Sequence, residues 1–308
     1  METLENVVEM AKSDAKGCYD EIVSVESVSF EDLSTMYIGS QRLDVLPAAK
    51  RLISGRLKVP QYYLERCPKE LQAENLNYWI RQESKKRKTL FMRMRNAQLR
   101  AVFTDRYIPV DNVTVLDALV SHGADLKAKV HVVKDENLFM VRIPDPKRGF
   151  NIRTRDRIVP GISITNSEVG YMALCIEAFF LRLVCTNGLI TQTLENKRLR
   201  HTSEKALENF TAALSSIASE LPAKSERLSF SGQSKVDDPE SSIEAFGKRF
   251  LLTQEEIAMV QSAYFAEPGK TMMDIINAFT LAAQANEVDA PTRYKLERAG
   301  GNILELLK

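Results

Sequence analysis

The pattern of hydrophobic and polar positions changes several times along this chain, and each pattern predicts a kind of element. Two pairs of alternating runs are each separated by three residues, which predicts two β-hairpins, one over 90–104 and one over 126–143. Between them, Asp111 and Asn112 precede an apolar stripe at helical spacing, which predicts a helix from Val113 to His122. Two hairpins around a helix indicate a mixed α+β core.

The longest apolar stretch runs from Ile162 to Ile190. Its apolar runs are interrupted by Asn166, Ser167, Glu168, Glu177, Arg182, Thr186 and Asn187. A buried polar group must be paired or it costs a few kcal/mol, so this polar island indicates either a specified local structure or a site. Residues 158–164 read as a strand. The run 171–185 has no clean period, which favours a central strand buried on both faces.

The rest of the chain divides by composition. Residues 1–60 are predicted to be an acidic N-terminal arm, with Ser29 and Asp32 opening a short helix. Residues 61–195 form the α+β core domain, and 196–308 form a helical C-terminal region with a loop at 222–240. A helix is predicted over 202–221, and others start near Ser241, Thr253, Thr271 and Pro291. The fold class is therefore α+β: an antiparallel, hairpin-rich sheet core with packed helices and a helical C-terminal region.

The segment 60–83 carries aromatic residues at helical spacing. Packing of this helix on the sheet is the favoured interpretation for Tyr62, Tyr63 and Trp79. Stacking of nucleic-acid bases on the same rings is the alternative.

Composition places the chain among folded proteins. Of 308 residues, 44% are hydrophobic and 27% charged, which leaves enough apolar mass for a core. Four scattered cysteines without a CxxC pair favour a reducing compartment. We expect a cytoplasmic protein, because the acidic N-terminus does not resemble an export signal and no apolar run is long enough to span a membrane.

The net charge of +1 conceals a strong asymmetry. The first 32 residues carry nine acids against two lysines, whereas Arg81 to Arg106 carries nine Lys or Arg against two acids. A phosphate backbone requires a track of cations, and interleaved aromatics stack on unpaired bases. The predicted nucleic-acid contacts are Lys85, Lys86, Arg87, Arg93, Arg95, Arg100, Lys147, Arg148, Arg153 and Arg155, with Tyr107 and Phe150 for stacking.

Catalytic patterns are weaker. The chain lacks GxxxxGK[ST], GxGxxG after a strand, and GxSxG, and its three histidines have no ligand at metal-binding spacing, so we expect neither a cofactor nor a metal site. A magnesium-dependent nuclease built on Asp105, Asp111 and Glu168 stays open as an alternative. So does a nucleophilic Cys185 paired with His201.

Several ordered strings resemble one known family. They are RAVFTDRYIPVDN at 100–112, PGISITNSEVGYMAL at 160–174, FFLRLVCTNGLI at 179–190 and the C-terminal TMMDIINAFTLAAQ with YKLERAGGNIL. Together they are similar to the phage- and plasmid-like family called domain of unknown function nine hundred and thirty-two, over roughly residues 75–305. The resemblance implies a cytoplasmic protein of mobile elements and no established activity. It also implies that Arg106 and Arg182 pair with Glu168 or Glu177.

The sequence thus predicts a non-enzymatic protein that binds single-stranded DNA in recombination, annealing or replication of a phage, plasmid or prophage. Its cations would gather along one continuous groove. A homo-oligomer and a host protein partner are compatible with the sequence, and an inhibitor of a host defence factor is a further alternative. No membrane partner is expected.

Overall fold

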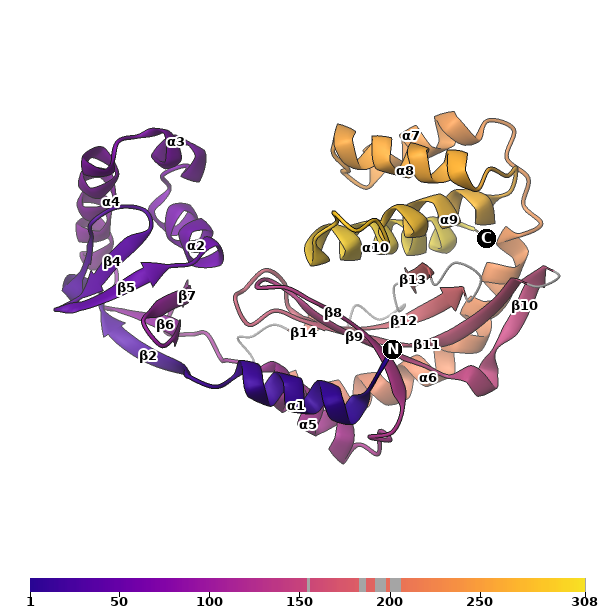
Figure 1. The fold of residues 1–308 in the computed structure, drawn as a ribbon, viewed down its shortest axis with the longest axis horizontal. Helices are drawn as coiled ribbons and strands as arrows, with labels where there is room; N and C mark the ends of the chain where they lie inside the picture. Colours follow the sequence, from indigo (N-terminus) through magenta and orange to yellow (C-terminus); the bar gives the residue numbers. More distant parts are fainter. Residues whose placement is uncertain (154–155, 183–186, 192–197, 200–205, 308) are drawn as a thin grey trace.

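The computed structural model describes residues 1–153, 156–182, 187–191, 198–199 and 206–307. Figure 1 shows a smaller unit of sheet and helices at one end of the molecule and a larger, layered unit at the other. The two units are joined by the segments around helix α1 and strand β2 and by the chain that leaves strand β7.

The smaller unit is built on a six-stranded sheet. Its spatial order is β2-β6-β7-β5-β4-β3, and all neighbours are antiparallel except β5 and β7. The strands are β2 (Cys18–Ser24), β3 (Val28–Phe30), β4 (Thr35–Ile38), β5 (Gln41–Val45), β6 (Thr89–Arg95) and β7 (Gln98–Phe103). The predicted hairpin over 90–104 is therefore confirmed as β6 and β7.

Three helices form the connection between β5 and β6, and they pack on this sheet. They are α2 (Pro47–Leu57), α3 (Gln61–Arg66) and α4 (Lys69–Ser84). Prolines stand before or at the first turn of each helix, where a missing N–H costs nothing. Leu76 and Ile80 of α4 point into a core shared with Met36, Leu43 and Met92 of the strands.

The larger unit contains an eight-stranded sheet with the main order β1-β8-β9-β11-β12-β13. Strand β10 pairs with β11, and β14 pairs with β12. The strands are β1 (Glu2–Thr3), β8 (Lys129–Lys134), β9 (Phe139–Pro144), β10 (Phe150–Arg153), β11 (Asp156–Asn166), β12 (Leu174–Arg182), β13 (Asn187–Thr191) and β14 (Arg198–Leu199). The β8–β9 hairpin and strands β11 and β12 are as predicted. Leu174 through Leu181 are all buried, as expected of a strand covered on both faces.

Helices cover the two faces of this sheet in separate layers. Figure 1 shows α1, α5 and α6 beneath it, and α9 and α10 above it with α7 and α8 outermost. The helices are α1 (Leu4–Asp14), α5 (Asn112–Ser121), α6 (Ala206–Ser231), α7 (Pro239–Arg249), α8 (Gln254–Ala266), α9 (Met272–Ala282) and α10 (Ala290–Leu306).

Side-chain caps explain why the C-terminal helices start where they do. Thr253 and Thr271 each form a capping box, with Glu256 and Asp274 respectively. Asp289 caps α10 through the backbone N–H of Thr292. The helix starts predicted from these local signals are confirmed to within two residues. Among the helices of the described residues, none combines the length and the apolar character that crossing a bilayer requires.

The prediction of an N-terminal arm over 1–60 is wrong. Residues 18–60 supply four strands and a helix of the smaller unit, and α1 packs on α5. Strand β2 was not predicted because it is an edge strand in which Val23 alone is buried, so its sequence does not alternate between apolar and polar residues. Ser29 lies in β3 and does not cap a helix; the buried Asp32 instead accepts a hydrogen bond from the Ser34 backbone N–H at 2.7 Å.

The predicted loop at 222–240 is also wrong over its first half, because α6 continues through Pro222 to Ser231. Ion pairs hold this polar stretch against α10: Lys224 Nζ lies 2.6 Å from Glu305 Oε1, and Arg227 pairs with the same carboxylate. The division at 61 and 195 also differs from the structure, in which the two sheets separate between β7 and α5 and helix α6 packs on the larger sheet.

Candidate nucleic-acid interface

The basic residues predicted to share one groove occupy three separate places. One group is buried where the two units meet, a second lies on the smaller unit, and a third lies at the far end of the larger sheet. The local geometry of each group decides what it can bind.

Arg93 belongs to the junction and is only 3% exposed. Its Nε donates to Asp20 Oδ1 at 3.0 Å, Nη1 donates to the Glu168 carbonyl oxygen at 3.1 Å, and Nη2 pairs with Asp111. Burial alone would lower the pKa of this guanidinium, but Asp111 and Asp20 outweigh burial and raise it. Arg93 is therefore a structural ion-pair centre with no free face for a phosphate.

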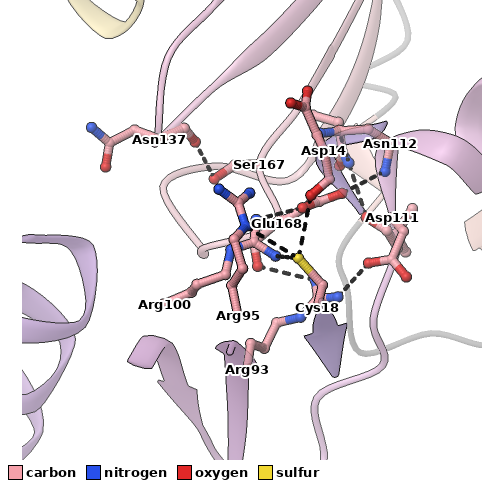
Figure 2. A network of polar contacts seen from close by, with 12 residues as sticks. Asp14, Cys18, Arg93, Arg95, Arg100, Asp111, Asn112, Asn137, Ser167 and Glu168 are labelled. Carbon is pink, nitrogen blue, oxygen red and sulfur yellow. Dashed lines mark hydrogen bonds and ion pairs between the residues drawn. The ribbon is translucent and has the colours of Figure 1, made fainter. Parts of the chain in front are cut away.

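Arg95 and Arg100 complete the same network. Figure 2 shows them reaching from the smaller sheet toward the loop that carries Glu168, with Cys18 beside them. Arg100 Nη2 lies 2.6 Å from Glu168 Oε2, and its Nη1 donates to Cys18 Sγ at 3.3 Å. Arg95 Nε donates to the same sulfur at 3.5 Å. These two predicted phosphate contacts are thus also engaged internally.

The polar island is the other half of this junction. Glu168 Oε1 accepts the backbone N–H of Asn112 at the start of α5, and Asn166 Nδ2 donates to Val110 O at 2.9 Å. Ser167 Oγ donates to Asn137 O at 2.6 Å (Figure 2). The island therefore fixes the larger sheet, α5 and the arginines of the smaller sheet in one arrangement.

The partners implied for the island's charges differ from those observed. Arg182 pairs with Asp156 at 2.7 Å and with Glu267 at 2.8 Å, and Arg106 lies exposed. Glu177 instead accepts a hydrogen bond from the Tyr294 hydroxyl at 3.0 Å.

Neither predicted stacking ring is fully exposed. Tyr107 is 9% exposed and stacks on Phe103 with ring centroids 3.8 Å apart. Burial raises the pKa of its hydroxyl to about 12. Phe150 is half-buried against Phe180 in the core of the larger unit. Both rings thus pack against other aromatic rings of the protein.

Lys147 and Arg148 are exposed but distant from the junction. They precede β10, where Phe150 pairs with Ile158, eight residues along β11 from Asn166. At roughly 3.3 Å per residue, the strand alone separates the two ends by roughly 26 Å. Figure 1 accordingly places β10 at the end of the molecule opposite the smaller unit. Arg155 and the side chain of Arg153 lie outside the described residues.

Lys85, Lys86 and Lys88 stay exposed in the turn between α4 and β6. Arg87, in the same turn, pairs with Asp105 at 3.1 Å and approaches Glu83 at 3.7 Å. We call residues 85–88 the basic turn. It is the part of the predicted cationic track that the structure leaves open to solvent on the smaller unit.

Helix α4, which leads into the basic turn, exposes aromatic side chains. Tyr78 is 56% and Trp79 43% exposed, and their rings meet edge to face at 5.1 Å. Tyr62 and Tyr63 of α3 are exposed as well. The favoured interpretation, in which this helix packs its aromatics on the sheet, is therefore wrong. A helical wheel could have predicted this exposure, because at about 100° per residue Tyr78 lies opposite Leu76 and Ile80, which face the core.

A hollow of about 610 Å³ follows the exposed side of α4. Leu71, Asn75, Tyr78 and Arg81 line it at intervals of three or four residues, which places them on one helix face. Glu74 also lines it, so an anion is expected nearer the Arg81 end. We call the surface formed by Leu71, Asn75, Tyr78, Trp79 and Arg81 the α4 face.

Comparison with known families bears on the larger unit. Residues 100–293 match the family described as Domain of unknown function (DUF932). The chain belongs to the DUF932 family. Searches of curated proteins and of solved structures find no match to it. The DUF932 segment begins at Arg100 in β7, so the α4 face and the basic turn precede it, and the junction of Figure 2 joins residues on both sides of that boundary.

The DUF932 segment carries a buried polar row across four strands. His131, Arg142, Ser163 and Glu177 are successive cross-strand neighbours on β8, β9, β11 and β12. Arg142 pairs with Glu297 of α10, which is fully buried. Burial raises the pKa of Glu297 even though Arg142 opposes the shift. These contacts fix α10 over the sheet.

The acids proposed for nuclease chemistry are each paired with an arginine. Asp105, Asp111 and Glu168 bind Arg87, Arg93 and Arg100 respectively. In the described part of the chain, no three His, Cys, Asp or Glu side chains gather closely enough to hold a metal ion. Cys185 and His201 lie outside the described residues.

Proposed function

We propose that this protein binds single-stranded nucleic acid on the α4 face and the basic turn. The observation that carries the proposal is the continuity of exposed Tyr78 and Trp79 with Arg81, Lys85 and Lys86 along one helix and the turn that follows it. Aromatic faces accept any base, and neighbouring cations follow the backbone. In a phage, plasmid or prophage, such a protein would serve recombination, annealing or replication.

Local charge supports this placement. From residue 47 to residue 106 the chain carries fifteen Lys or Arg against five Asp or Glu. Arg93 and Arg100 of the strands are paired with carboxylates at the junction, whereas Lys85, Lys86 and Lys88 of the basic turn stay exposed. An exposed aromatic pair beside such a surface favours a ligand that is both planar and anionic.

Fluorescence anisotropy with a 3′-labelled 20-nucleotide DNA tests the proposal. The protein is titrated into the single strand and into the duplex, each at 50 and 200 mM salt. We expect tighter binding of the single strand. Replacing Tyr78 and Trp79 together by Ala removes about 1–3 kcal/mol per stacked base, so affinity falls at least tenfold at both salt concentrations. Replacing Lys85 and Lys86 by Ala removes two phosphate contacts and lowers the salt slope by about 1.4.

The matched control is the double replacement of Lys147 and Arg148 by Ala, which removes two exposed cations from the opposite end of the molecule. Its affinity should equal that of the unchanged protein. An equal loss in this control would contradict the α4 face as the site, and absence of binding at 50 mM salt would contradict the function. In that second case, a change of oligomeric mass in the Tyr78/Trp79 variant, read by mass photometry, would assign the face to self-association.

A further inference from the structure

A second hollow, of about 530 Å³, opens on the smaller unit between α2 and β7. Arg51, Gly55 and Arg56 of α2 line one side, and Phe103 and Thr104 line the other. Its size falls within the usual range for small-molecule sites. It is distinct from the hollow of the α4 face, with which it shares no lining residue.

Two guanidinium groups that line this hollow, and a third next to it, have hydrogen-bond donors without a partner. Arg51 Nη2, Arg56 Nε and Arg87 Nε are shielded from solvent and have no hydrogen-bond partner. Buried N–H groups are paired in the great majority of native structures. Two such donors on residues that line one hollow, with a third on Arg87 beside the lining residue Glu83, therefore indicate a ligand that accepts hydrogen bonds.

The charge balance specifies the ligand further. Glu83 stands 3.6 Å from Arg56 and 3.7 Å from Arg87, so one carboxylate serves two guanidinium groups. Arg51 lies over the ring of Tyr171 at 5.1 Å and pairs with no carboxylate among the described residues. Burial and the like charge of Arg87 lower the pKa of Arg56. An anion placed here relieves that repulsion.

The shape of the hollow favours a phosphate group attached to a ring system. Guanidinium forks bind phosphate oxygens in pairs. The Phe103 ring, backed by Tyr107, supplies an aromatic wall. Gly55 leaves room, because a Cβ built there meets no atom within 4 Å.

We infer that this hollow binds a phosphate monoester of nucleotide size, either a free mononucleotide or the 5′-phosphorylated end of a strand. The second source rests on the proposed function, since the basic turn adjoins the hollow through Arg87 and would pass a bound strand to it. The first source is independent of that function.

Gly55→Asp provides the test, because it adds a negative charge to the hollow without removing any contact, and Gly55→Ala is the matched control. Titrations of AMP and of inorganic phosphate, followed by calorimetry, measure the free ligand. Anisotropy with 3′-labelled single strands bearing either a 5′-phosphate or a 5′-hydroxyl measures the strand end. Thermal unfolding confirms that both variants are folded.

We expect the 5′-phosphate to improve strand affinity about tenfold in the unchanged protein and in Gly55→Ala, with the advantage lost in Gly55→Asp. Binding of AMP that Gly55→Asp abolishes, without any strand binding, would support the hollow as a mononucleotide site and overturn the proposed function alone. Equal affinity for both strand ends together with no AMP binding would overturn the inference and leave the α4 face standing. Equal effects of Gly55→Asp and Gly55→Ala would also overturn it.

Discussion

Replacing Arg93 by Ala separates a structural role from a nucleic-acid contact. The substitution leaves Asp20, Asp111 and the Glu168 carbonyl oxygen without their shared donor. Removing one partner of a fully buried pair costs about 3–5 kcal/mol. The side chain of Asp111 stays 42% exposed and that of Asp20 26%, so water recovers part of the loss. We therefore expect Arg93→Ala to lower the free energy of unfolding by about 2–4 kcal/mol.

Urea unfolding followed by circular dichroism measures this loss as a fall in the transition midpoint at unchanged slope. Arg106→Ala is the matched control, because Arg106 is an exposed arginine outside the network and should change stability by less than about 0.5 kcal/mol. Arg93→Lys keeps the charge without the planar fork and should fall between the two.

The same variant discriminates between the two roles of Arg93. If Arg93 acts only at the junction, Arg93→Ala at a temperature where it remains folded binds single-stranded DNA with the affinity and salt slope of the unchanged protein. A loss of stability under about 1 kcal/mol combined with a flatter salt slope would refute the reasoning and return Arg93 to the nucleic-acid interface.

Two other predictions concern the larger sheet and one concerns α2. Gly161→Ala should destabilise the protein by about 2 kcal/mol or more, because a Cβ there would stand 2.3 Å from the Ile143 carbonyl oxygen; denaturant unfolding checks this. Gly55→Ala, in the open helix face of α2, should instead stabilise by about 0.5–1 kcal/mol in the same assay, and a loss there would contradict the helix argument. Burial, with the charge of Arg142, lowers the pKa of His131 from its ordinary 6.5, so the unfolded chain takes up this proton first and stability falls as pH drops below about 6.5. His131→Gln should flatten that fall between pH 7 and 5 in thermal unfolding, and parallel curves would rule out this histidine as its source.

Elements with local signals could be predicted from the sequence. The capping residues Thr253, Thr271 and Asp289 directly precede the helices that they start. Each hairpin consists of two strands that are adjacent in the sequence and joined by a short turn. The strands β2 to β5 could not be predicted in the same way, because β3, β4 and β5 are short and β2 is an exposed edge strand. The parallel pairing of β5 with β7 across three helices is a non-local contact without a local pattern.

The sequence predicts a surface of cations and aromatic rings, but not which of these residues lie on it. A charge count detects arginines without their partners, and the partners of Arg93 lie 73 and 75 residues away in the sequence at Asp20 and Glu168. The sequence shows that α4 contains aromatic residues. It does not show how many apolar side chains of the helix the sheet can cover, and so which of them stay exposed. Leu76 and Ile80 already fill the core side of the helix, which leaves Tyr78 and Trp79 outside.

Acids of the N-terminal segment pair with cations of the two sheets, so the net charge of +1 does not describe the charge of any one surface. Asp20 of β2 neutralises Arg93 of the neighbouring strand, and Asp14 at the end of α1 pairs with Lys134 of the larger sheet. These two acids are used in pairs between parts of the protein, whereas Glu21 and Glu26 of the same segment stay exposed. Among the described residues, the exposed Lys85, Lys86 and Lys88 of the basic turn form no ion pair, unlike Arg56 and Lys69 of the helices. A chain with balanced composition can thus keep exposed cations without ion pairs on one surface when some of its acids are paired elsewhere.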